Sequence, residues 1–197
     1  MSDFYAGEKW RAFDLGHPGG AESTKKLLLK GNVEPDDRIL DLCCGAGNSV
    51  RLCSELGFDV SGVDRAPVIE HTRKNDHDHS YLVWESSGSE VARLPFEDGS
   101  FDVVLCECSL SLLEDKSAVM REVHRVLLHG GRFLVSDLYD GIPPDFEGFR
   151  RVWWEDATES LRSFIASWIW EMGTVFPSPS CRSGKQYFLG VYEAICK

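Results

Sequence analysis

Two glycines and two acidic residues near the start of the chain have the spacing of a nucleoside-binding site. The run Asp41-Leu-Cys-Cys-Gly-Ala-Gly47 follows a short apolar segment, and Asp64 closes a second apolar segment 17 residues after Gly47. The glycines let the backbone approach a ligand without an intervening Cβ, and a helix that begins near Asn48 directs free N–H groups at it. The acid at the end of the second strand can accept both hydroxyls of a ribose.

The elements that must position these residues follow from the apolar pattern. Five strands are predicted at residues 38–43, 58–64, 81–84, 101–106 and 132–136, with helices at 21–30, 48–56, 67–75 and 116–128. The pair Gly130-Gly131 is expected to end the last of these helices. Such alternation of strands and helices predicts an α/β fold with a parallel sheet and right-handed crossovers.

The pattern changes after Asp140. About eight residues, 141–148, separate the fifth strand from a strand predicted at 149–154, which is too few for a normal crossover helix. A helix at 158–172 and a last strand at 187–192 follow. We expect the aromatic residues of this part to form core or dimer contacts rather than the wall of a ligand site. They are Trp153, Trp154, Phe164, Trp168 and Trp170.

The bulk composition is that of one ordinary globular domain. The chain has 197 residues, of which 43% are hydrophobic and 27% charged. Its formal charge of −11 would repel phosphate backbones and anionic membranes, so we expect no nucleic acid or membrane partner. The N-terminal residues lack the pattern of a signal peptide, and the seven cysteines lie mostly in apolar segments. A cytoplasmic chain with reduced thiols is the expectation.

Two other nucleotide sites fit the glycine run poorly. A nicotinamide dinucleotide fold needs a third small residue three positions after the second glycine, and that position is Val50. A phosphate-binding P-loop needs Gly-Lys-Ser/Thr, which the run lacks.

Four ordered segments instead resemble the class I S-adenosylmethionine-dependent methyltransferases, particularly the group akin to ubiquinone and menaquinone C-methyltransferases. They are Arg38-Ile-Leu-Asp-Leu-Cys-Cys-Gly-Ala-Gly47, Gly62-Val-Asp64, Leu94-Pro-Phe-Glu-Asp-Gly-Ser-Phe-Asp-Val-Val104 and Arg125-Val-Leu-Leu-His-Gly-Gly-Arg-Phe133. The resemblance covers about residues 20 to 140 and implies a Rossmann-like, doubly wound, mostly parallel sheet with an antiparallel last strand. The single domain, 1–197, would comprise an N-terminal helical lid segment (1–35), a cofactor-binding core (36–140) and a variable C-terminal part (141–197).

The resemblance also implies a set of site residues. Asp64 would accept the ribose hydroxyls, and Asp41 would hold the loop or the methionine amino group. Glu90 is the best match for the acid that accepts the adenine amino group, with Ser89 or a backbone contact as alternatives, and Cys43 replaces the first glycine of the family pattern. The implied cofactor-binding residues are Asp41, Cys43, Gly45, Gly47, Asp64, Arg65, Glu90, Val91 and Glu107.

Candidate catalytic groups lie where strands are expected to end. Glu107 ends the fourth strand near the expected methyl group, Tyr139 and Asp137 end the fifth, and His17 precedes the first helix. A general base is optional, because the methyl of a sulfonium compound is already activated. Any proton removal from the acceptor would fall to a carboxylate or imidazole within hydrogen-bond reach. We expect no metal site, and we expect His71, His77 and His79 to lie on a solvated surface.

The expected function is methyl transfer from S-adenosylmethionine to a small-molecule acceptor, with S-adenosylhomocysteine as by-product and a homodimer as a possible assembly. One alternative is a sensor or partner subunit that binds S-adenosylmethionine or S-adenosylhomocysteine without turnover. Another, motivated by the seven cysteines, is arsenite methylation. That chemistry would require three thiols, Cys43, Cys44 and Cys108, to converge on the methyl group.

Overall fold

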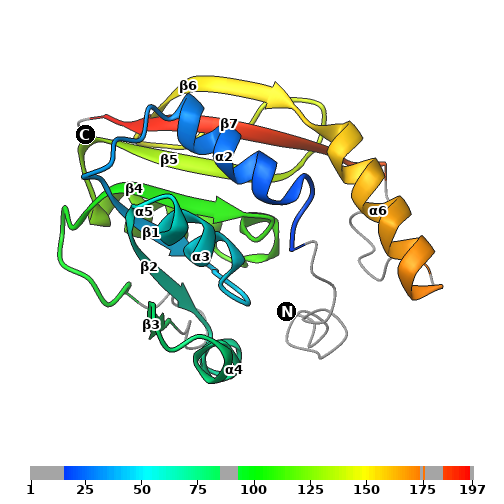
Figure 1. Cartoon of the computed structure of the whole chain (residues 1–197). Coiled ribbons are helices and arrows are strands. Elements are labelled where there is room, and N and C mark those ends of the chain that lie inside the picture. The colour runs from blue at the N-terminus through cyan, green and yellow to red at the C-terminus, as the bar shows by residue number, and fades with distance from the viewer. Residues whose placement is uncertain (1–15, 85–92, 174, 176–183, 196–197) are drawn as a thin grey trace.

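The computed structural model describes residues 16–84, 93–173, 175 and 184–195. Within these residues, seven strands form one sheet in the order β3-β2-β1-β4-β5-β7-β6 (Figure 1). Their bounds are β1 Arg38–Leu42, β2 Asp59–Asp64, β3 Ser80–Val83, β4 Phe101–Glu107, β5 Leu127–Tyr139, β6 Phe149–Asp156 and β7 Gln186–Ala194.

Strands β1 to β5 pair with one another in parallel, and β7 is antiparallel to both β5 and β6. This arrangement confirms the prediction of a mostly parallel sheet with an antiparallel last strand. Strand β1 lies between β2 and β4, so the chain changes direction across the sheet at this point. In open α/β sheets, ligands bind at such a switch point, outside the carboxyl ends of the strands.

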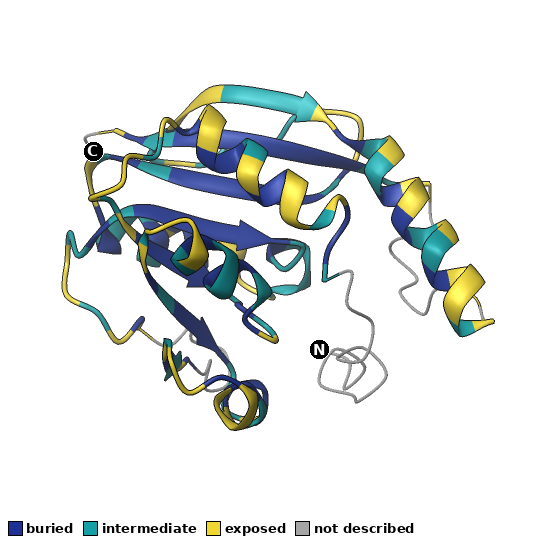
Figure 2. Cartoon of the chain, viewed as in Figure 1, coloured by how far each residue is buried: buried dark blue, intermediate teal, exposed yellow. Residues whose placement is uncertain are grey.

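Helices cover both faces of the sheet, because each buries an apolar stripe against it. On one face, Leu27, Val50 and Leu161 of α2, α3 and α6 share a core cluster. On the other face, Val119 and Val123 of α5 pack into the second cluster. In Figure 2 the sheet is mostly buried, and the exposed residues gather on the outer sides of the helices. The helices are α2 Gly20–Lys30, α3 Asn48–Glu55, α4 Ala66–Asn75, α5 Lys116–Val126 and α6 Thr158–Met172, with a short 3₁₀ turn η2 at Leu110–Leu112.

The boundary between α5 and β5 differs from the prediction. Helix α5 ends at Val126, and β5 begins at Leu127 rather than at residue 132. Leu127 is buried and pairs with Phe101, after which a bulge shifts the register. Gly131 passes so close to the neighbouring strand that a Cβ would lie 2.9 Å from the carbonyl oxygen of Asp102. Core burial of Leu127 and strand pairing therefore end the helix before the two glycines.

The segment between β5 and β6 contains no helix, as its length predicted. Of the proposed N-terminal lid, residues 1–15 lie outside the described residues, and α2 is the part that the structure describes. Within the described chain, every helix is too short or too polar to cross a membrane.

Candidate functional site

The two glycines of the loop after β1 have different surroundings. Both have positive φ, +54° at Gly45 and +81° at Gly47. A Cβ added to Gly45 would meet no atom within 4 Å, whereas one added to Gly47 would overlap the hydroxyl oxygen of Tyr81. Gly45 therefore borders open space that a ligand can enter. Gly47 makes room for a side chain of the protein itself.

Two cysteines adopt a backbone conformation that favours glycine. Cys43, directly after β1, has a φ of +64°, and Cys108, directly after β4, has a φ of +56°. Such residues cost of order 1–3 kcal/mol each, and they concentrate at functional sites. The strained positions flank the switch point between the two strands. Cys43 occupies the position where the family pattern has glycine, and its φ explains that preference.

Asp64, at the end of β2, links this strand to the glycine loop through hydrogen bonds. Its Oδ2 accepts the backbone N–H of Gly45 at 2.9 Å, and its Oδ1 accepts the backbone N–H of Arg65 at 2.7 Å. Burial raises the pKa of Asp64, and these two hydrogen bonds oppose the rise. A carboxylate offers about four lone-pair sites, so each oxygen keeps one for a ligand hydroxyl.

Glu107 at the end of β4 joins three parts of the chain in a buried cluster. Its Oε2 accepts hydrogen bonds from Thr24 Oγ1 at 2.9 Å and from Ser49 Oγ at 2.8 Å. His17 Nε2 lies 3.3 Å from the same oxygen and 3.3 Å from Thr24 Oγ1. The structure thus brings together the two candidates Glu107 and His17. Thr24 on α2 and Ser49 on α3 are residues that sequence reasoning missed, although Ser49 follows the glycine loop directly.

Asp41 and Glu107 each carry a buried oxygen that lacks a partner within the described part of the chain. These atoms are Oδ2 of Asp41 and Oε1 of Glu107. Burial raises the pKa of Asp41 well above its usual range, and the nearby charges of Glu107 and Asp64 raise it further. An unpaired buried carboxylate is costly unless a positive group compensates it. The site is therefore complementary to a cationic ligand.

Tyr139 lies apart from this cluster. Its ring packs in the core on the α5 face, edge-on to Trp154 and Phe188, whereas Glu107 contacts α2 and α3 on the other face. Its hydroxyl donates to Oδ2 of Asp156 at 2.5 Å, and burial together with Asp156 raises its pKa to about 12. The structure therefore does not place Tyr139 with the other candidate catalytic groups.

Asp137 is also held by the protein itself. Its oxygens accept the backbone N–H groups of Ser111 and Leu138, each at 2.6 Å. The bond from Ser111 links the end of β5 to the 3₁₀ turn after β4.

The three thiols considered for arsenite do not converge. Cys43 packs against the core cluster on the α5 face, and Cys44 and Cys108 pack against the cluster on the opposite face. Among the described residues, no group of three His, Cys, Asp or Glu side chains is arranged to hold a metal ion. The three-thiol site expected for arsenite is not formed by these cysteines.

Several other predictions have distinct outcomes. Glu90 and Val91 lie outside the described residues. His79 is not simply a solvated residue, because its Nδ1 lies 2.7 Å from Oδ1 of buried Asp76. In the aromatic set, for which core or dimer contacts are expected, Phe164 and Trp168 lie in the core and Trp170 is 89% exposed.

Comparison with known proteins identifies the family. Residues 40–135 match the methyltransferase domain family. YodH, an uncharacterized methyltransferase of Bacillus subtilis, is 32% identical over 142 residues, which cover 68% of this chain and 60% of that protein. The arsenite methyltransferase of Mus musculus is 31% identical over 136 residues, which cover 60% of this chain and 35% of the mouse protein. The chain belongs to the class I S-adenosylmethionine-dependent methyltransferases.

The fold of this methyltransferase agrees with solved structures. Geranyl diphosphate methyltransferase in complex with S-adenosylmethionine superimposes with a TM-score of 0.67 at 20% identity, over 93% of this chain and 95% of that one. The chain spans less than two thirds of the length of the two curated relatives. The cofactor of this methyltransferase is S-adenosylmethionine. S-adenosylmethionine carries two positive groups, a sulfonium and an amino group, and positive groups are what the unpaired oxygens of Asp41 and Glu107 require.

Proposed function

We propose that this chain binds S-adenosylmethionine across the ends of β1, β2 and β4 and transfers its methyl group to a small-molecule acceptor. The observation that carries the proposal is the pair of buried, unpartnered oxygens on Asp41 and Glu107. A cation can pair with both oxygens and favours the ionised form of Asp41, which burial and the neighbouring carboxylates otherwise disfavour. Open space beside Gly45 gives such a ligand a place to lie.

Each cofactor-binding role in this proposal belongs to a particular residue. Asp64 would accept the ribose hydroxyls with its remaining lone pairs, and Asp41 would hold the methionine amino group. Glu90 would accept the adenine amino group and Val91 would flank the ring. The residues after β1 and β2 whose backbone is proposed to lie against the cofactor are Cys43, Gly45, Gly47 and Arg65.

The protein's share of the chemistry is alignment and the exclusion of water. When bound, S-adenosylmethionine supplies a methyl group that its sulfonium charge has already activated. Alignment of an acceptor behind such a group contributes roughly 7–11 kcal/mol in well-oriented systems. Where the methyl acceptor must lose a proton, the atom proposed to take that proton is Oε1 of Glu107. His17, 3.3 Å from Oε2 of Glu107, would then stabilise the carboxylate or relay the proton.

A small molecule is the acceptor that the charge of the chain favours. The formal charge of −11 opposes binding of a nucleic acid. One relative is a methyltransferase of Synechococcus elongatus named for the small molecule 2-phytyl-1,4-naphthoquinone. The single-domain organisation of residues 1–197 and a homodimer are part of the same proposal.

A binding protein without turnover is the second candidate function. The observation that favours it is the short connection 140–148, which follows β5 without a helix. A short connection leaves few residues from which the wall of an acceptor pocket could be built, which suits a sensor that holds only the cofactor.

Calorimetric titration followed by product detection separates these functions. The chain is titrated with S-adenosylmethionine, then incubated with a panel of quinones, thiols, amines and carboxylic acids, and S-adenosylhomocysteine is quantified. Formation of S-adenosylhomocysteine that depends on one acceptor supports the enzyme. Tight binding with no turnover on any acceptor supports the sensor, and absence of binding overturns both.

A further inference from the structure

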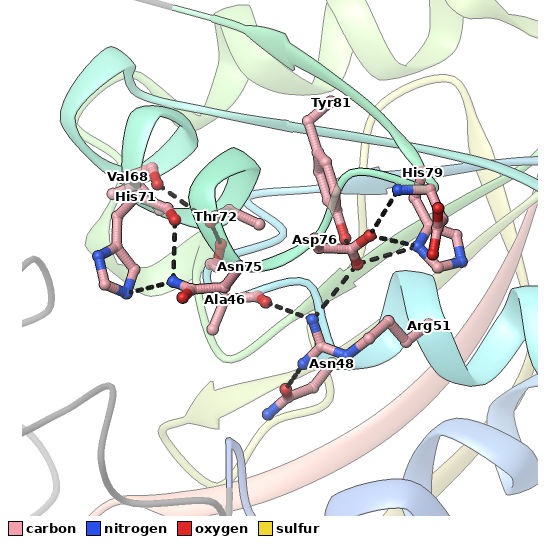
Figure 3. Close-up of polar contacts among 12 residues, drawn as sticks. Ala46, Asn48, Arg51, Val68, His71, Thr72, Asn75, Asp76, His79 and Tyr81 are labelled. Carbon is pink, nitrogen blue, oxygen red and sulfur yellow. Dashed lines mark hydrogen bonds and ion pairs between the residues drawn. The ribbon is translucent and has the colours of Figure 1, made fainter.

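A polar network centred on Asp76 lies behind the glycine loop. Asp76 follows α4 and is 7% exposed. Its Oδ2 accepts a hydrogen bond from the hydroxyl of Tyr81 at 2.7 Å, and its Oδ1 lies 2.7 Å from Nδ1 of His79. Nη1 of Arg51 lies 3.5 Å from Oδ2 (Figure 3). The carboxylate thus orients groups from β3, from the turn before it and from α3.

Two side chains of this network, those of Arg51 and Tyr81, contact the glycine loop itself. Arg51 donates through Nη1 to the carbonyl oxygen of Ala46 at 2.9 Å (Figure 3). The hydroxyl of Tyr81 occupies the space that a Cβ on Gly47 would need. Ala46 and Gly47, consecutive residues of the loop, are therefore both held from behind by side chains that Asp76 orients.

A third contact from α4 completes the support. The hydroxyl of Thr72 lies 2.7 Å from the carbonyl oxygen of Gly45 and 3.0 Å from that of Val68, and it can donate to either. With its carbonyl held, Gly45 directs its N–H at Asp64, 2.9 Å away. The contacts behind the loop thus set the geometry on its ligand-facing side.

We propose that Asp76, Tyr81 and Arg51 are positioning residues for S-adenosylmethionine. They keep residues 45–47 in the conformation that the cofactor needs, and they act through the loop without touching the ligand. Preorganisation of this kind raises affinity because the free protein does not have to order the loop on binding. The inference rests on the proposed cofactor site.

The first test compares two buried tyrosines. Tyr81→Phe removes the hydroxyl that lies behind Gly47 and keeps the ring. Tyr192→Phe is the matched control, since Tyr192 is also buried and donates to the carbonyl oxygen of Pro144 at 2.6 Å, in the other core cluster. Calorimetry with S-adenosylmethionine is expected to show a Kd about fivefold higher for Tyr81→Phe, the effect of about one hydrogen bond, and an unchanged Kd for the control.

A measurement of stability separates positioning from general support. Both variants lose one buried hydroxyl, so urea denaturation is expected to show similar losses of unfolding free energy. If Kd follows stability in both variants, the network is merely structural and the inference is wrong. Amide NMR shifts of Gly45 and Gly47 are expected to move in Tyr81→Phe alone.

A second series covers the case in which Tyr81→Phe does not fold. Arg51 has a side chain that is 38% exposed, so its replacement leaves the core intact. Arg51→Met is expected to raise Kd about fivefold, and Arg51→Lys to restore part of the affinity through its remaining donor. Arg162→Met, at an exposed arginine of α6 paired with Glu159, is the control and is expected to bind normally.

The outcomes distinguish this inference from the proposed function. If the wild-type chain does not bind S-adenosylmethionine, the proposed function fails. If the wild-type chain binds it and both Tyr81→Phe and Arg51→Met bind equally well, the inference alone is overturned.

Discussion

The hydroxyl group of Tyr81 lies in the space where a side chain at position 47 would begin. Tyr81 is on β3, two strands away from β1, so this contact joins the edge of the sheet to the loop at its switch point. Gly47 is therefore required by the packing of the protein. Gly45 has open space in the same position and is required only by its backbone conformation and by any ligand.

Alanine at these two positions is expected to have unequal effects on stability. Gly45→Ala should cost about 1–2 kcal/mol of unfolding free energy, because an alanine at φ +54° is strained but meets no atom. Gly47→Ala should cost more, because the same strain is joined by overlap with Tyr81. Urea denaturation of both variants measures the difference, and equal losses would show that the overlap relaxes freely.

Asp64→Ala is expected to weaken binding of S-adenosylmethionine by about tenfold or more, since charge-assisted hydrogen bonds to the ribose would be lost. The matched control is Asp59→Ala, at the exposed start of the same strand. Calorimetry should show control affinity within about twofold of wild type. An unchanged Kd for Asp64→Ala would contradict the ribose-binding role.

Cofactor binding is expected to release a proton from Asp41. Burial, with the charges of Glu107 and Asp64, raises the pKa of Asp41 well above its ordinary value, so the ligand-free protein keeps the proton beyond pH 4. A bound cation favours the ionised form, so affinity should rise as pH rises through that elevated pKa. Titrations in two buffers of different ionisation enthalpy measure the release.

The variant Asp41→Asn provides the control for this proton release. It has no carboxyl proton to lose, so its binding enthalpy should be nearly independent of the buffer. If wild type and Asp41→Asn show the same buffer dependence, the proton comes from another group.

Ionised Asp76 is expected to stabilise the fold, and this stabilisation is expected to disappear as the pH falls into the acid range. Burial raises its pKa, but hydrogen bonds from His79 and Tyr81 outweigh burial and lower the pKa to about 2. Because the folded pKa is depressed, the stabilisation is complete above about pH 4 and is lost as pH falls toward 2. Wild type should lose roughly 2 kcal/mol more than Asp76→Asn over this interval, as measured by urea denaturation at each pH. Parallel losses would show that Asp76 is not ionised in the network.

Much of the fold could be predicted because its signals are local. The apolar runs of β1, β2 and β4 and the stripe of α5 lie within single segments, so periodicity identifies them. The start of β5 could not be predicted in the same way. Leu127 joins the strand because it pairs with Phe101 across the sheet, and no local pattern reports that contact.

The same distinction between local signals and contacts of distant residues applies to the candidate site. Asp41, Asp64 and Glu107 could be predicted because each lies at the end of an apolar run. The partners of Glu107 could not, since Thr24 is 83 positions away and reaches it only through the packing of α2 on the sheet. His79 was misjudged for a related reason. Its turn is polar in sequence, but Tyr81 and Arg51 bury the carboxylate that it contacts.

The place of β7 between β5 and β6 has a consequence for synthesis of the chain. Strand β6 leaves the ribosome before β7, and within the described sheet β7 is its one neighbour. Until β7 emerges, the growing polypeptide exposes the unpaired edges of two strands, which are templates for association with other chains. The nascent chain is therefore expected to be most prone to association with other chains between the synthesis of β6 and that of β7.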